Sequence, residues 1–232
     1  MPEPADVCLG LAPIWTLPAC TALIEASGAR RLVQLSSTSR FTKAGSRNTG
    51  EAATARRLAE AEAALEAWAT RQGIAWTILR PTMIYGDGRD ANVAEIARFI
   101  RRFGFFPLFG RAAGLRQPVA AADVAGAVLA AAGAPAAENR AYDIAGGETL
   151  SYRRMVERIF TAEGRRPVTP TVPLAAFRLA SAALRLLPRH PGWTAEMAER
   201  MNRDLVFDNG AAVRDFGYAP GPFRPEPLPR KR

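Results

Sequence analysis

The sequence contains only one histidine and two cysteines among 232 residues, which excludes several kinds of catalytic and metal site. His190 stands between Arg189 and Pro191, so a Ser-His-Asp triad or a histidine metal centre lacks its parts, and we expect a loop histidine. Cys8 and Cys20 have neither metal-ligand spacing nor a secretory context. We therefore expect both cysteines to be small buried hydrophobic residues and predict no metal.

A long apolar run is also missing. The most apolar helical stretch, residues 174–187, lies between prolines and contains Arg178 and Arg185, whereas a membrane-spanning helix needs roughly 20 apolar residues. The first six residues are acidic and contain proline, unlike a signal peptide. These absences predict a cytoplasmic protein with no membrane partner.

Acidic residues are outnumbered by basic ones, 22 against 31, which gives a net charge of +9 and a pI near 10.6. Such a charge suits nucleic acid, acidic membranes or anionic small molecules. However, the basic residues are spread over many expected helices, and only the tail at residues 229–232 is clustered. We interpret most of them as solvated faces and a few as contacts to an anionic ligand, and we predict no nucleic-acid partner.

What the sequence does contain is an alternation of strand and helix patterns. Strands are expected at residues 7–12, 31–35, 74–79 and 141–145, where apolar or β-branched runs end at polar or proline positions. Helices are expected at residues 16–28, 51–72, 90–102 and 123–133, the last two capped by Asp90 and Asp123. Residues 103–116 read as a long loop. The alternation predicts an α/β fold with a partial, Rossmann-like, doubly wound parallel sheet.

Beyond Gly146-Gly147 the pattern changes to helices joined by proline-rich connections. Helices are expected from Thr149 or Ser151 to residue 163, and at residues 173–187, 194–203 and 208–216. We divide the chain into residues 1–147, a small mostly helical lobe at residues 148–218, and an extended, proline-rich basic tail at residues 219–232.

The central stretch, Ile74 to Asp90, places a glycine-rich loop after a short apolar strand that Pro81 ends. In α/β sheets, ligands bind where such loops leave the carboxyl ends of parallel strands. The residues Leu79-Arg80-Pro81-Thr82-Met83-Ile84-Tyr85-Gly86 resemble the R-P-x-x-[IV]-Y-G segment of the extended short-chain dehydrogenase/reductase family. These are the NAD-dependent epimerase/dehydratases of nucleotide sugars, and the resemblance extends over nearly the whole chain.

The resemblance implies an NAD(P)-binding domain at residues 1–147, with NAD or NADP as cofactor, and a substrate lobe at residues 148–218. It implies cofactor contacts from Leu11, Ala12, Pro13, Arg80, Pro81 and Ile84. Counting back from Phe41, the catalytic Ser/Thr of the family falls on Ser37, whose hydroxyl could share a proton with a substrate carbonyl. For the neighbouring hydroxyl residues we prefer a role as loop caps.

The substrate half of the family pattern is also present. Asn92, Phe109 and Arg116 match positions that contact the nucleotide part of a nucleotide sugar, and a guanidinium suits a diphosphate through its paired donors. The alternatives are core packing for Phe109 and a first-turn helix position for Asn92. The resemblance also allows a homodimer, because family members commonly pair through helices that include residues 51–72 here.

Two departures from the family concern catalysis and the cofactor. The usual tyrosine and lysine are replaced by Thr54 and Leu58 when Glu62 is aligned with the glutamate that follows them. No glycine-rich turn follows the first strand, where Gly10 has no glycine partners. By resemblance, residues 9–12 match the end of the fourth strand of the family, so three strands and the main cofactor clamp are missing, and the strand at residues 7–12 should have an uncovered edge.

Two functions follow from this pattern. The first is an NAD(P)-dependent epimerase/dehydratase-like oxidoreductase acting on a nucleotide sugar or a related small molecule, in an N-terminally truncated form. The second is a catalytically silent nucleotide-sugar-binding or scaffold protein of the same fold, favoured by the missing dyad. Binding of NADH or NADPH separates them.

Overall fold

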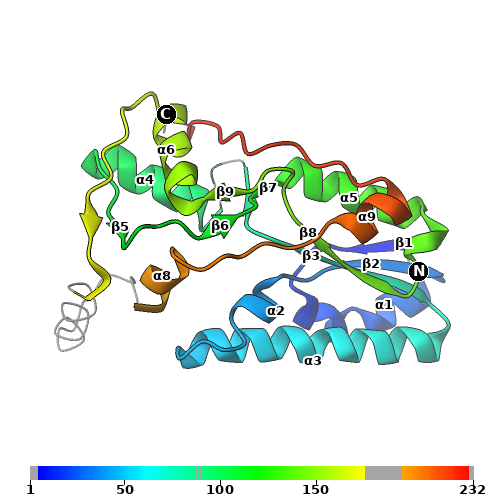
Figure 1. The fold of residues 1–232 in the computed structure, drawn as a ribbon. Helices are drawn as coiled ribbons and strands as arrows, with labels where there is room; N and C mark the ends of the chain where they lie inside the picture. The colour runs from blue at the N-terminus through cyan, green and yellow to red at the C-terminus, as the bar shows by residue number, and fades with distance from the viewer. Residues whose placement is uncertain (1–4, 87, 89, 176–194, 230–232) are drawn as a thin grey trace. The chain divides into compact units, whose positions relative to one another are not determined.

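A computed structural model of the chain describes residues 5–86, 88, 90–175 and 195–229 (Figure 1). The chain forms two compact units. Unit 1 comprises residues 1–82, 121–145 and 207–221, and unit 2 comprises residues 83–120, 146–206 and 222–232. His190 and most of the helix predicted at residues 173–187 lie outside the described residues.

Unit 1 is built on a sheet of four parallel strands. They are β1 (Val7–Gly10), β2 (Arg31–Leu35), β3 (Ala75–Pro81) and β8 (Arg140–Ile144), in the order β1-β2-β3-β8. Because β3 lies between β2 and β8, its inner residues are almost completely buried, and this explains its run of apolar side chains. The parallel α/β fold predicted from the sequence is confirmed.

Helices cover both faces of this sheet (Figure 1). The helices η1 (Ile14–Ala19), α1 (Thr21–Ala26) and α3 (Thr49–Gln72) pack on one face, while α5 (Ala121–Gly133) and α9 (Gly210–Phe216) pack on the other. The core between α3 and the sheet includes Leu32, Leu58, Leu65, Ile74 and Ile78. This arrangement is the doubly wound form that the alternating patterns indicate.

The helix boundaries in unit 1 follow local signals with three corrections. Asn48 accepts a hydrogen bond from the Glu51 amide at 3.1 Å, and Gly73 ends α3 with a φ of 67°, so the helix begins two residues before the prediction. Asp123 does not cap α5, because the helix begins at Ala121; instead its carboxylate accepts from the Gly221 amide at 3.0 Å. The single helix expected at residues 16–28 is divided into η1 and α1.

The strand β1 lies at the edge of the sheet, as predicted. Among the described residues it pairs only with β2, and the side chains of Val7 and Leu9, and of Leu11 just after the strand, are exposed. The prediction for the cysteines is wrong in part, because Cys8 is half-buried but Cys20 is exposed, where the chain passes from η1 to α1.

The last residue of β1, Gly10, lies against the side chain of Gln34. A Cβ atom at Gly10 would stand 1.8 Å from Gln34 Oε1, and Gln34 Nε2 donates to the carbonyls of Ala12 and Leu35, both at 2.9 Å. We expect Gly10→Ala to displace this side chain and lower the free energy of unfolding by about 1–2 kcal/mol in urea titrations. The control is Gly45→Ala, which meets no atom within 4 Å and should change stability by less than about 0.5 kcal/mol. Equal values for the two variants would contradict the prediction.

Unit 2 contains short strand pairs and three described helices. The pairs are β4 (Ile84–Tyr85) with β7 (Val119–Ala120), β5 (Leu108–Phe109) with β10 (Thr171–Val172), and β6 (Leu115–Arg116) with β9 (Leu150–Ser151). The helices are α4 (Val93–Phe103), α6 (Tyr152–Ala162) and α8 (Ala195–Arg200). The region predicted as a loop at residues 103–116 therefore contains β5, whose two residues are buried in the core of the unit.

Two other predictions for unit 2 have clear outcomes. Ser151 caps α6 by accepting from the Arg154 amide at 3.1 Å, which selects it over Thr149. The tail is extended, as expected, but Phe223 is buried, contacts the Tyr85 ring edge-on and donates its amide to Glu148. Phe223 thus anchors this part of the tail in the core of unit 2.

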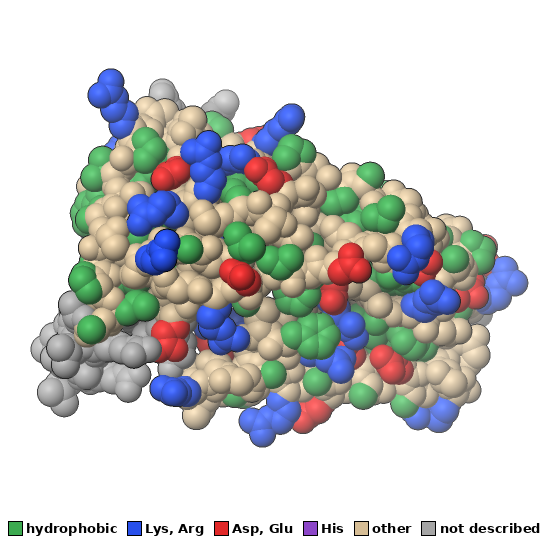
Figure 2. Space-filling model, in the orientation of Figure 1, with side chains coloured by type: hydrophobic (Ala, Val, Ile, Leu, Met, Phe, Trp, Pro, Cys, Tyr) green, Lys and Arg blue, Asp and Glu red, His purple; other side chains and the backbone are tan. Residues whose placement is uncertain are grey.

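The surface shows how the basic charge is distributed. On the face seen in Figure 2, Lys and Arg side chains are scattered, with acidic and neutral side chains between them. No helix within the described ranges is both long enough and apolar enough to cross a membrane.

Candidate functional site

The candidate site of unit 1 lies at the carboxyl ends of β2 and β3. After β2, the Ser36 amide donates to the Leu79 carbonyl at 2.7 Å and the Thr38 amide donates to the Pro81 carbonyl at 3.1 Å. These bonds continue the pairing of the two strands beyond β2 and hold the hydroxyl residues beside the Arg80-Pro81 dipeptide. Ser37 and Pro81, which the sequence singled out separately, are therefore neighbours.

Four hydroxyl residues follow β2, and the first three have different environments. The Ser36 hydroxyl donates to Glu62 Oε1 at 2.6 Å, and the Thr38 hydroxyl donates to the Pro81 carbonyl at 3.2 Å. The Ser37 hydroxyl accepts from the Ser39 amide at 3.1 Å and has no acceptor for its own proton among the described residues. Of the three, Ser37 is the one whose O–H remains available to a ligand.

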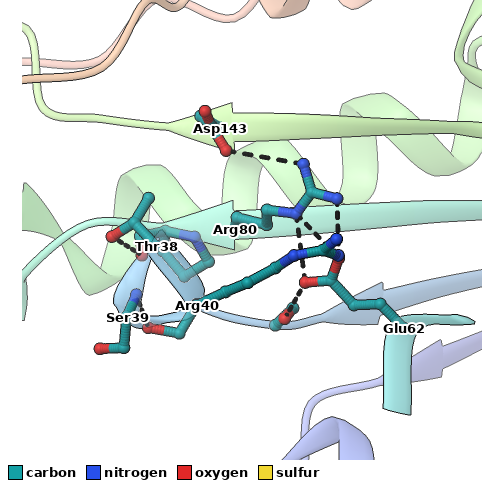
Figure 3. Close-up of polar contacts among 9 residues, drawn as sticks. Thr38, Ser39, Arg40, Glu62, Arg80 and Asp143 are labelled. Atoms are coloured by element: carbon teal, nitrogen blue, oxygen red, sulfur yellow. Dashed lines mark hydrogen bonds and ion pairs between the residues drawn. The ribbon is translucent and has the colours of Figure 1, made fainter. Parts of the chain in front are cut away.

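A buried carboxylate organises the site (Figure 3). Glu62, on α3, is completely buried, and Arg80 donates to both of its oxygens, with Nε at 3.1 Å from each and one terminal nitrogen at 2.7 Å from Oε2. Arg40, on the short helix α2 (Ser39–Thr42), also donates to Oε2. One negative charge is thus shared by two guanidinium groups and the Ser36 hydroxyl. We call Ser36, Arg40, Glu62 and Arg80 the Glu62 cluster.

The pKa values of the two carboxylates in this region are shifted in opposite directions. Burial by itself would raise the pKa of Glu62, but hydrogen bonds from Arg80 and Ser36 and the charges of both arginines outweigh it, and the pKa lies below its ordinary range. Burial raises the pKa of Asp143. Its Oδ1 lies 3.9 Å from an Arg80 nitrogen and has no hydrogen-bond partner among the described residues. Glu62 is therefore held as an anion, whereas Asp143 is the carboxyl group that takes up a proton more readily.

The geometry indicates that Arg80 positions its neighbours Glu62 and Phe41. Its donors are directed at Glu62, and its guanidinium lies over the Phe41 ring at 5.3 Å. Sequence reasoning selected Arg80 but missed Arg40 and Asp143 as its neighbours. The sequence signal that could have indicated this cluster is Glu62. It lies on the same helical stripe as Leu58 and therefore faces the core.

The positions that align with the usual tyrosine and lysine lie on α3. The Thr54 hydroxyl donates to the Gly50 carbonyl at 2.8 Å, within its own helix. Leu58 is buried in the core under the sheet. Neither side chain can supply the proton transfer that a tyrosine and lysine would.

The residues after β1 were predicted to contact a cofactor. Leu11 and Ala12 are exposed, and Pro13 adopts extended backbone angles before η1. Together with the Ser37 hydroxyl they offer an apolar surface and one donor, which fits the nicotinamide part of a dinucleotide. The described residues after β1 provide no cradle for the pyrophosphate, because Gly10 is followed by no second glycine and a Cβ there would meet Gln34 rather than free space. The residues therefore fit the cofactor only in part.

Unit 2 holds the other predicted ligand contacts. Ile84 is half-buried in β4, and Asn92 is exposed at the start of α4, where its amide donates to Asp90 Oδ1 at 3.0 Å. Asp90 also accepts from the Ala94 amide at 3.1 Å, but the N-cap position is Asn92, so α4 begins three residues later than predicted. The Phe109 ring is 4% exposed and belongs to the core of the unit, which leaves little of it for a ligand.

Arg116 is buried, with 4% of its surface exposed. Its guanidinium donates to the carbonyls of Leu115 and Arg203, both at 2.7 Å, and to the Arg200 carbonyl. Burial lowers the pKa of Arg116 to about 10, an effect that Tyr152 opposes. The side chain predicted to bind a diphosphate is thus directed at the backbone around α8.

The family model for the NAD dependent epimerase/dehydratase family matches residues 15–145, which is more than half of the chain. The chain belongs to this family. Its matched segment includes the whole Glu62 cluster, Ser37 and the Arg80-Pro81 dipeptide. The family therefore agrees with the resemblance of the central stretch, and the fold of unit 1 is the one that the family predicts.

The similarity of this family member to individual proteins is summarised by three examples. A 2-alkyl-3-oxoalkanoate reductase from Shewanella oneidensis is 30% identical over 152 residues, and the chain spans 39% of that relative. Among solved structures, RMD from Pseudomonas aeruginosa in complex with NADPH has a TM-score of 0.66, 14% identity, and coverage of 94% of this chain and 77% of that one. UDP-glucose 4-epimerase from Thermotoga maritima with UDP-glucose has a TM-score of 0.61, 18% identity, and coverage of 93% and 72%. At these identities the structures establish the fold.

Proposed function

We propose that the chain is an NAD(P)-dependent oxidoreductase-like protein of the epimerase/dehydratase type, acting on a nucleotide sugar or a related small molecule. The observation that carries the proposal is the available Ser37 hydroxyl beside Pro81 at the carboxyl end of a family-matched parallel sheet. Relatives that are a reductase and a nucleotide-sugar epimerase support the same reaction class.

Each residue at this end of the sheet has a proposed part. Leu11, Ala12 and Pro13 would contact the nicotinamide half of the cofactor, together with Pro81 at the end of β3. Ser37 would donate its proton to a substrate carbonyl, which suits reduction of a ketone or its reverse. The Glu62 cluster would hold the loop after β2 in place. When bound, the cofactor would supply the hydride chemistry.

A specific observation favours the second function, a silent binding protein of the same fold. Thr54 bonds within its own helix and Leu58 is buried in the core, so the positions of the family dyad carry no proton-transfer group. In this case the chain would bind a nucleotide sugar without converting it. Asn92, which is exposed, is the predicted substrate contact in unit 2 that is best placed for this role.

Titration with NADH and NADPH tests the proposal. We expect a saturable change in nicotinamide fluorescence with one of the two, and reduction of a ketone substrate, tested with a keto-sugar nucleotide and a 3-oxo acid. Ser37→Ala should keep cofactor affinity and lower turnover about 100-fold, because it removes the proton donor alone. Ser39→Ala is the matched control and should leave turnover unchanged. Absence of saturable binding by both cofactors would refute the oxidoreductase proposal, and binding without turnover would favour the silent protein.

A further inference from the structure

Unit 2 contains a cavity of about 590 Å³ that no part of the proposed function uses. It lies beside the end of β5, the strand β10 and the start of α6. Its lining includes Gly110, Arg111, Ala112, Ser151, Arg153 and Thr171. Among the described residues, two arginines and two hydroxyl residues line it, and no acidic side chain does.

Arg153 carries a positive charge that no carboxylate neutralises within the described part of the chain. Its guanidinium is half-buried and donates to the hydroxyls of Thr169 at 3.3 Å and Thr171 at 3.1 Å. Nearby arginines of the same helix are different, since Arg154 pairs with Glu157 at 3.2 Å and Arg158 pairs with Glu148. A partly buried guanidinium held only by neutral groups is poorly compensated, and an anion in the cavity would supply the missing charge.

The other polar groups of the cavity can also donate. The Ser151 hydroxyl accepts from the Arg154 amide, and the Thr171 hydroxyl accepts from Arg153, so each retains a proton for a ligand. Arg111 is exposed and makes no ion pair with the described residues. The cavity therefore presents two guanidinium groups and two hydroxyl donors.

The wall of the cavity is fixed in a strained backbone shape. Ala112 has a φ of 50°, which is uncommon for a residue with a side chain, and it is completely buried. Its amide donates to Asn202 Oδ1 at 2.9 Å, and its carbonyl accepts from the Arg153 amide at 3.0 Å. Ala112 thus joins its own loop to the start of α6. These bonds hold Arg111 and Arg153 beside the same cavity before a ligand binds.

We propose that this cavity binds the phosphoryl group of a small molecule. Arg153 and Arg111 would hold its oxygens through their paired donors, and Ser151 and Thr171 would complete the shell. The volume lies within the range of small-molecule sites and exceeds the size of a phosphate ion, so an organic part attached to the phosphoryl group has room. None of these residues belongs to the predicted cofactor or substrate contacts, so the site stands whether or not the nicotinamide proposal holds.

Calorimetric titration of the full chain with inorganic phosphate and with glucose 1-phosphate, at constant ionic strength, tests this site. We expect saturable binding of both to the wild-type chain, at least tenfold weaker binding to Arg153→Gln, and none detectable to Arg111→Gln/Arg153→Gln. The matched control is Arg154→Gln, which removes the same charge from the next residue and should bind within twofold of wild type. Tighter binding of glucose 1-phosphate than of phosphate would identify an organic ligand, and equal binding a free anion.

Two results would overturn the proposal. One is the absence of saturable binding of either probe to the wild-type chain. The other is equal weakening by Arg154→Gln and Arg153→Gln, which would show a general effect of net charge. If Arg153→Gln lowers the melting temperature, the exposed Arg111 provides the test instead. Arg111→Gln should weaken binding at least threefold with an unchanged melting temperature. Unchanged binding to this variant would reject the site.

Discussion

Replacing Glu62 by glutamine is expected to lower the free energy of unfolding by about 3–5 kcal/mol, because it leaves Arg40 and Arg80 close together without their shared counter-charge. Glutamine has almost the same shape, so the loss measures charge and hydrogen bonding rather than a cavity. Denaturant titration followed by circular dichroism gives the value. The control is Glu60→Gln on the exposed side of the same helix, which should cost less than about 0.5 kcal/mol. Similar values for the two variants would show that the Glu62 cluster contributes little.

The same variant has a distinct dependence on pH. The pKa of Glu62 is lowered in the folded chain, so its contribution to stability is complete above the ordinary carboxylate pKa of about 4.3 and is lost as the pH falls through the lower, folded value. The difference in stability between wild type and Glu62→Gln should therefore be constant from pH 7 to about pH 5 and shrink below about pH 4. A difference that grows in acid would contradict the assignment.

Replacing Arg116 by leucine is expected to lower the free energy of unfolding by about 3 kcal/mol, as three backbone carbonyls lose their donor in a buried place. Arg116→Lys should recover only part of this, since one ammonium cannot match the flat guanidinium toward all three. Denaturant titration provides the values, with Arg166→Leu, an exposed position, as the control expected to stay within about 0.5 kcal/mol.

The outcome for Arg116 bears on function. If Arg116→Leu left stability unchanged but removed binding of UDP-glucose, the side chain would be a ligand contact, as the family resemblance implies. A loss of stability without specific loss of binding in Arg116→Lys would instead make it a positioning residue for the segment around Arg200 and Arg203.

Local patterns predicted the longer elements, which include the strands of unit 1 and the helices α4 and α6 of unit 2. The strand at residues 31–35 and the end of α3 at Gly73 follow directly from an apolar run and a terminal glycine, because burial and capping act within a few residues. The position of Ser37 beside Pro81 agrees with the rule that the carboxyl ends of parallel neighbours meet at one edge. Short pairs such as β5 with β10 were not predicted, because two-residue strands have no recognisable period.

The candidate sites were harder to predict than the fold because their contacts join distant parts of the chain. Arg40 contacts Glu62 and Asp143 lies near Arg80, and these residues come from segments with no shared motif. Nothing in the local sequence therefore indicates these contacts. The buried state of Arg116 likewise depends on carbonyls more than 80 residues away. For Arg153, the missing ion pair is visible only when every carboxylate around it is placed.

The open side of β1 has a consequence for how this architecture tolerates variation in length. Its outward-facing amides and carbonyls are where a sheet can grow without breaking an existing ladder, since β2 and β3 are already flanked on both sides. Added strands at this position would pair with the backbone of β1 and leave the opposite end of the order, at β8, untouched. Homologues with wider sheets could thus share the arrangement of Ser37 and Glu62 unchanged. Their additional strands would lie next to β1, at the opposite end of the strand order from β8, which carries Asp143.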